Sequence, residues 1–139
     1  MKISRAPLAL ILLLIAGSAM AQGSDWDFAA KSKEKCSDGS QMQMNDCLRQ
    51  EYERSDKKLN ASYRRLLQLL EDPSALKKAQ IAWLSFRDAT CAYENSGIGK
   101  DGSLYPYGWN ACMIDVTNKR IRDLDMYQDW DCNGCPPRK

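Results

Sequence analysis

The sequence contains no histidine, and this absence narrows the chemistry that the protein can perform. Histidine is the side chain that most often acts as a general acid or base, and it is a common metal ligand. No two carboxylates fall at an obviously convergent spacing for acid–base work. If the cysteines are oxidised, as argued below, thiolate nucleophiles are missing as well. The composition therefore favours a protein that binds a partner over an enzyme.

The chain also has little continuous hydrophobic sequence. Its longest apolar stretch, residues 8–15, is preceded by two basic residues and followed by Ala19-Met20-Ala21, the small residues that a signal peptidase accepts. A transmembrane helix needs about 20 apolar residues. We therefore expect residues 1–21 to be a cleaved secretory signal peptide. Residues 22–139 should form a single domain, without a membrane anchor, in the periplasm or outside the cell.

An excess of charge of one sign is missing too. The chain has 20 basic and 18 acidic residues, and two of the basic residues lie in the expected signal peptide. Nucleic acids and anionic membranes require a concentrated basic surface, so the balanced charge argues against both as partners. Residues 22–56 hold eight acids against five bases, which is a weak local acidic excess.

Six cysteines are present, an even number in a chain expected to be exported. This pattern predicts three disulfides, which commonly stabilise small domains. Spacing alone leaves fifteen connectivities open. A structural zinc site needs four ligands, whereas the sequence has no histidine and a single C-x-x-C, so we expect neither a metal nor another cofactor. A redox role for that motif, Cys132-Asn133-Gly134-Cys135, is disfavoured because it follows a helix, where the dipole does not stabilise a thiolate.

The rest of the sequence is patterned for helices. Apolar residues recur every three or four positions over residues 40–71, which predicts one long amphipathic helix. They are Met44, Leu48, Tyr52, Leu59, Tyr63, Leu66 and Leu70. Asp72-Pro73 ends this helix and opens a second one that extends to about Glu94. A third helix is expected over residues 109–130, and residues 22–36 form either a short helix or a loosely docked arm.

Between the second and third helices, residues 95–108 contain four glycines and a proline, which predicts a long loop. Its mixture of aromatic and small residues is typical of recognition surfaces. The predicted partner-binding residues are Asp101, Gly102, Ser103, Tyr105, Tyr107 and Trp109. The alternative is that these aromatic side chains fold down and cap the bundle. At the other end, the tail should be frayed beyond Cys135.

Several spaced motifs occur in one order along these helices. They are Met44-Asn45-x-Cys47, Asp56-x-x-Leu59-Asn60-x-x-Tyr63, Leu76-x-x-Ala79-Gln80-x-x-Trp83-x-x-x-Arg87-x-x-x-Cys91, Gly102-Ser103, Cys112 and Thr117-x-x-Arg120-x-x-x-Leu124. Together they resemble the LprI-like lysozyme-inhibitor family over about residues 36–124. The resemblance implies an exported helical fold, and from it we predict a lysozyme inhibitor that occludes the enzyme's active-site cleft. The alternatives are an interaction module for another envelope protein or secreted toxin, and an enzyme or redox protein that uses the terminal dithiol.

The expected helix layout also brings polar motif residues together. If the first two helices fold back at residues 72–73, equal distances from the turn place Asn60 near Arg87, with Asp56 within reach. A link between Cys91 and Cys112 then makes the third helix antiparallel to the second. We predict a partly buried structural network rather than a catalytic site. Its expected members are Asp56, Asn60, Arg87, Thr117 and Arg120.

The same layout favours one disulfide connectivity. We expect the pairs Cys36–Cys47, Cys91–Cys112 and Cys132–Cys135, because each joins neighbours along the chain or across antiparallel helices. The fold class predicted from all these patterns is all-α: a disulfide-stapled antiparallel bundle with three main helices and a possible short N-terminal helix.

Overall fold

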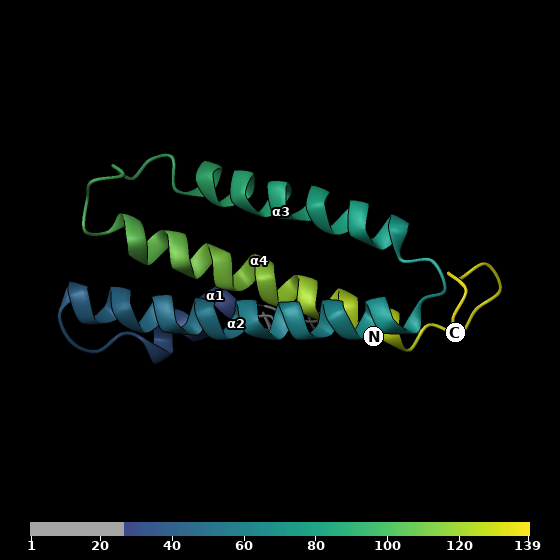
Figure 1. Cartoon of the computed structure of the whole chain (residues 1–139). Coiled ribbons are helices and arrows are strands. Elements are labelled where there is room, and N and C mark those ends of the chain that lie inside the picture. Colours follow the sequence, from purple (N-terminus) through teal and green to yellow (C-terminus); the bar gives the residue numbers. More distant parts are fainter. Residues whose placement is uncertain (1–26) are drawn as a thin grey trace, which may run out of the picture.

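The computed structural model describes residues 27–139, and this part of the chain is an all-α bundle. The expected signal peptide, residues 1–21, lies outside the described residues. The helices are α1 (Phe28–Lys35), α2 (Gln41–Leu69), α3 (Ser74–Glu94) and α4 (Tyr105–Gln128). Figure 1 shows α2 and α4 side by side, α3 along the far side of α4, and the short α1 across the pair. The central helix is α4, because it packs against each of the other three.

The helix boundaries follow from local capping. Ser40 caps α2 in a reciprocal pair with Gln43, whose side chain accepts a hydrogen bond from the Ser40 backbone N–H at 2.8 Å. At the start of α3, Pro73 occupies the cap position and the Asp72 carboxylate accepts from the Ser74 N–H at 2.9 Å. The Asp27 carboxylate likewise accepts from the Ala30 N–H at the start of α1. Because Phe28 packs on the core and α1 contacts α4, residues 28–35 form a docked helix and not a loose arm.

The third main helix begins four residues earlier than the sequence predicted, so the connection to it spans only residues 95–104. Pro106 lies in the first turn of α4, where its missing N–H leaves no intrahelical hydrogen bond unmade. Gly108 lies against the buried side chain of Asn95, and a Cβ at this position would come within 2.2 Å of Asn95 Oδ1. The glycine permits close helix packing here and does not mark a loop.

The hydrophobic core has three parts along the bundle. The first lies under α1 and holds the Cys36 end of a disulfide, the second joins α2 to α4, and the third surrounds the base of the α3–α4 connection. Their buried members are Cys36, Leu48, Ala111 and Ile114; Leu59, Leu66, Leu70 and Leu124; and Cys91, Cys112 and Met113. The structure forms the three expected disulfides, Cys36–Cys47, Cys91–Cys112 and Cys132–Cys135.

The C-terminal tail is docked, and the prediction that it frays beyond Cys135 is wrong. Arg138 donates hydrogen bonds to the backbone carbonyls of Tyr127 and Gln128, which are acceptors left free where α4 ends. Arg138 also forms an isolated antiparallel bridge with Leu70. In Figure 1 the yellow tail therefore lies beside the connection between α2 and α3.

Candidate functional site

Two arginines are nearly buried between α3 and the pair formed by α2 and α4. Arg87 and Arg120 are each 8% exposed. The Arg87 guanidinium lies 5.4 Å from the ring centre of Trp83 and 5.9 Å from that of Tyr52. The Arg120 guanidinium lies 5.8 Å from Trp83 and 6.0 Å from Tyr127. Rings and cations therefore alternate in one stack, in which each contact contributes about 0.5–2 kcal/mol.

The predicted polar network forms around one end of this stack. The Asn60 amide donates to the Asp56 carboxylate and to its backbone carbonyl, both at 2.9 Å. Arg87 Nη1 lies 3.7 Å from the Asp56 carboxylate, and Arg87 Nε donates to Asp88 at 2.9 Å. The Asp56 side chain is 39% exposed, so the acidic half of the network faces solvent. The structure brings Asp56, Asn60 and Arg87 together at the level expected from the turn.

Two other predicted members of the network do not join it. The Thr117 side chain is fully buried, and its hydroxyl makes no hydrogen bond within residues 27–139. Arg120 instead donates from Nε to Gln80 Oε1 at 3.1 Å. The sequence analysis assigned no role to Gln80. Its position was nevertheless informative, because a glutamine on the buried face of a helix, one turn before Trp83, is expected to form a hydrogen bond with a neighbouring helix.

The aromatic residues of the predicted recognition loop lie in the first turns of α4 and are half-buried. Tyr107 packs against the core beneath α1, and Trp109 packs against the core beside the Cys91–Cys112 disulfide. The ring of Tyr105 stacks on Trp109 with 5.9 Å between ring centres. Tyr107 and Trp109 therefore behave as the capping alternative describes. Asp101, Gly102 and Ser103 remain exposed in the turn that precedes α4.

Large apolar side chains nevertheless face solvent around that turn. Tyr93 near the end of α3 is 80% exposed, and Leu104 at the cap of α4 is 51% exposed. The turn is fixed to the bundle on both sides, because the Cys91–Cys112 disulfide closes its base and the Asn45 amide of α2 donates to the Ser103 carbonyl at 2.8 Å. The turn (residues 95–104) together with Tyr93 is called the turn surface below.

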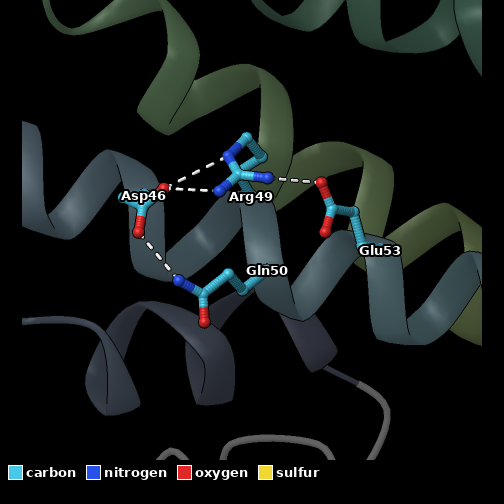
Figure 2. Close-up of polar contacts among 4 residues, drawn as sticks. All are labelled: Asp46, Arg49, Gln50 and Glu53. Carbon is cyan, nitrogen blue, oxygen red and sulfur yellow. Dashed lines mark hydrogen bonds and ion pairs between the residues drawn. The ribbon is translucent and has the colours of Figure 1, made fainter.

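The acidic residues of α2 are paired with nearby bases. Figure 2 shows Asp46 accepting from Arg49 and Gln50, and Arg49 reaching on to Glu53. The Arg49 hydrogen bond is the main cause that lowers the pKa of Asp46 below its ordinary value. Glu51 pairs with Arg54 and with Lys35 of α1. The three bases in these contacts are already counted among the five bases of residues 22–56, so the acidic side chains are paired but the weak acidic excess of this part of the chain remains.

The same pairing predicts how stability depends on pH. Three carboxyl groups have a lowered pKa, and in each case the main cause is a hydrogen bond that the carboxylate accepts. Asp46 accepts from Arg49, Glu51 from Arg54, and Asp72 from the Ser74 backbone N–H. A lowered pKa in the folded state contributes stability that is present above the ordinary values, 3.8 for aspartate and 4.5 for glutamate, and is lost as pH falls through the folded values.

Because the chain has no histidine, we expect the melting temperature to be nearly constant from pH 5.5 to 8 and to fall progressively below about pH 4. Differential scanning calorimetry of the oxidised protein in buffers of equal ionic strength would measure this. A step in melting temperature between pH 6 and 7 would contradict the conclusion that carboxyl groups cause the pH dependence of stability.

Two kinds of feature are missing from the part of the chain that the structure describes. No helix among residues 27–139 combines the length and apolar composition needed to cross a membrane. The same residues contain no cluster of three or more histidine, cysteine, aspartate or glutamate side chains able to hold a metal ion.

Comparison with known proteins places this bundle in a family. The chain is similar to a protein of Escherichia coli (strain K12) named "Uncharacterized protein YecT", with 35% identity over 60% of this chain and 61% of the relative. It is also similar to "Uncharacterized protein R02472" of Rhizobium meliloti (strain 1021), with 33% identity over 61% of this chain and 71% of that relative. No solved structure matches. The profile of the family described as "Lysozyme inhibitor LprI" matches residues 32–124, and the chain therefore belongs to the LprI lysozyme-inhibitor family.

Proposed function

We propose that this protein is an exported lysozyme inhibitor that acts by binding and has no catalytic role of its own. Family membership supplies the target class, and the disulfides fit an oxidising compartment such as the periplasm or the cell exterior. The turn surface is the part of the molecule we assign to the target. It would occlude the active-site cleft of the enzyme.

One observation carries this assignment: an exposed, glycine-containing turn with apolar side chains is fixed to the bundle at its base. The Cys91–Cys112 disulfide and the hydrogen bond from Asn45 to Ser103 hold the turn before a partner arrives. A turn that is already ordered loses less conformational entropy on binding. Exposed Tyr93 and Leu104 provide the apolar contact area on which affinity at an interface commonly depends.

The half-buried aromatic residues have a supporting role in this proposal. Asp101, Gly102, Ser103 and Tyr105 would contact the enzyme, whereas Tyr107 and Trp109 pack beneath them against the core. Replacing these two half-buried residues would therefore lower stability and inhibition together. Binding is better tested at positions whose side chains make no core contact.

The test is inhibition of lysozyme-catalysed cell-wall lysis by the purified mature protein and by the double variant Tyr93→Ala with Leu104→Ala. Each replaced side chain is at least half exposed, so the melting temperature should stay within about 2 °C of the parent. Loss of two apolar anchors should weaken inhibition by about thirtyfold.

A matched control replaces two apolar residues that are exposed elsewhere, Ile81 on α3 and Met126 on α4, which are 67% and 50% exposed. This control should inhibit like the parent. Undiminished inhibition by the turn variant would rule out the turn surface as the binding site. Failure of the parent protein to inhibit any lysozyme tested would favour an interaction module for another envelope protein or a secreted toxin.

A further inference from the structure

A cleft of about 350 Å³ lies between α2 and α3, away from the turn surface. Its lining combines four polar or charged residues, one tyrosine and three aliphatic residues. They are Asp56, Asn60, Lys77, Gln80, Tyr63, Leu59, Ile81 and Leu84. This mixture of an apolar wall with a few convergent polar groups is typical of a small-molecule site.

Core packing does not account for all the motif residues in this cleft. Leu59 is 1% exposed and belongs to the core joining α2 to α4. Asn60 is exposed, yet it belongs to the same motif, and Ile81 on the opposite wall is 67% exposed. These two side chains contribute little to the folded core. A ligand lying between the helices would give both of them a contact.

Hydrogen-bond donors gather at one end of the cleft. Gln80 lines the cleft, and because its side-chain carbonyl oxygen accepts from Arg120, its amide nitrogen is the group that remains available as a donor. Lys77 precedes Gln80 by about one helical turn on the same face of α3, and its side chain is exposed. An ammonium group and an amide N–H, with the Arg120 charge behind them, form a site suited to a carboxylate.

Hydrogen-bond acceptors gather at the other end. The Asn60 amide nitrogen donates to Asp56, which leaves the Asn60 carbonyl oxygen free to accept. The Asp56 carboxylate lies level with Arg87, and ten residues separate Arg87 from Lys77 along α3. Ten residues correspond to about 15 Å along a helix axis. The cleft is therefore elongated, with Lys77 at one end, the Asp56 carboxylate beside Arg87 at the other, and aliphatic side chains between them.

We propose that this cleft binds a short peptide of about three residues through its free ends. The C-terminal carboxylate would lie at Lys77 and Gln80, and the N-terminal ammonium at Asp56. An apolar central side chain would lie between Ile81 and Leu84. An extended tripeptide spans about 10 Å, and the lysine and aspartate side chains reach inward over the remaining distance.

The probe is the tripeptide alanyl-leucyl-alanine, titrated into the oxidised full-length mature protein by isothermal titration calorimetry. We expect saturable binding of one peptide per chain. Amidation of the peptide C-terminus removes one charge-assisted interaction and should weaken binding about tenfold or more. Acetylation of its N-terminus should weaken binding through the loss of the contact with Asp56.

Two neighbouring lysines provide a matched pair of variants. Lys77 lines the cleft and Lys78 does not, while both are exposed on the same helix. Lys77→Met should weaken binding of the free peptide about tenfold and abolish the difference between its acid and amide forms. Lys78→Met should leave the affinity for the free peptide and the difference between the acid and amide forms unchanged. The absence of saturable binding, equal affinity for the acid and amide peptides, or equal effects of the two variants would each overturn the proposal.

Discussion

Arg87→Ala should lower the free energy of unfolding by about 3 kcal/mol at pH 7. The arginine is 8% exposed and lies between the rings of Tyr52 and Trp83, so its removal deletes two cation–π contacts and leaves a gap between α2 and α3. The carboxylate of Asp56 also loses its nearest cation, which lies 3.7 Å away in the parent protein. Because Asp56 is partly solvated, most of the loss should come from the stacked guanidinium.

Urea denaturation followed by circular dichroism would measure this effect, and two further variants identify its cause. Arg87→Lys keeps the charge but not the planar group that stacks on the rings, so it should recover only part of the lost stability. Arg64→Ala removes an exposed arginine from α2 and should change stability by less than about 0.5 kcal/mol. An Arg87→Ala protein as stable as the parent would show that the stack does not hold α3 in place.

The position of Arg87 illustrates what could be predicted from the sequence. Apolar periodicity and the break at Asp72-Pro73 predicted two long antiparallel helices, and counting outward from that break placed Asn60 and Asp56 opposite Arg87. The structure confirms this register. Such reasoning succeeds because a long helix has a fixed rise and a fixed angular spacing, so one known turn determines the level of every residue on both helices.

The errors occurred where a local signal competed with a tertiary contact. Four glycines and a proline predicted a loop up to Gly108, but glycine is also required where two helices approach closely, and only the position of Asn95 shows which applies. The tail was predicted to fray beyond Cys135, whereas Arg138 docks it onto the last carbonyls of α4. Both contacts join residues ten or more positions apart, which the three- and four-residue spacing of a helix pattern does not reveal.

The preference of Arg120 for Gln80 is a similar case. Arg120 was predicted to join the polar network, and the structure instead places its guanidinium 5.8 Å from the ring centre of Trp83. Sequence spacing could not decide which side chain the guanidinium would bond within the bundle. That choice depends on rotamers fixed by packing in the finished core.

The disulfides should differ in their contributions to stability according to the length of chain each one closes. Cys91 and Cys112 are separated by 21 residues, and replacing both with alanine should lower the free energy of unfolding by about 3 kcal/mol. Cys132 and Cys135 are separated by three residues, so the same double replacement there should cost less than about 2 kcal/mol. Cys91 is also fully buried, which adds a small cavity to the first variant.

Urea denaturation of the two double variants, each with the other disulfides intact, would test this order. The Cys91→Ala with Cys112→Ala variant should also lose lysozyme inhibition under conditions where it remains folded, because the base of the turn surface is no longer closed. The variant at Cys132 and Cys135 serves as the matched control and should inhibit like the parent, since the tail lies at the opposite end of the bundle (Figure 1). If the tail variant were the less stable of the two, docking of Arg138 would depend on the terminal disulfide, and the tail would contribute more to the fold than the closed turn.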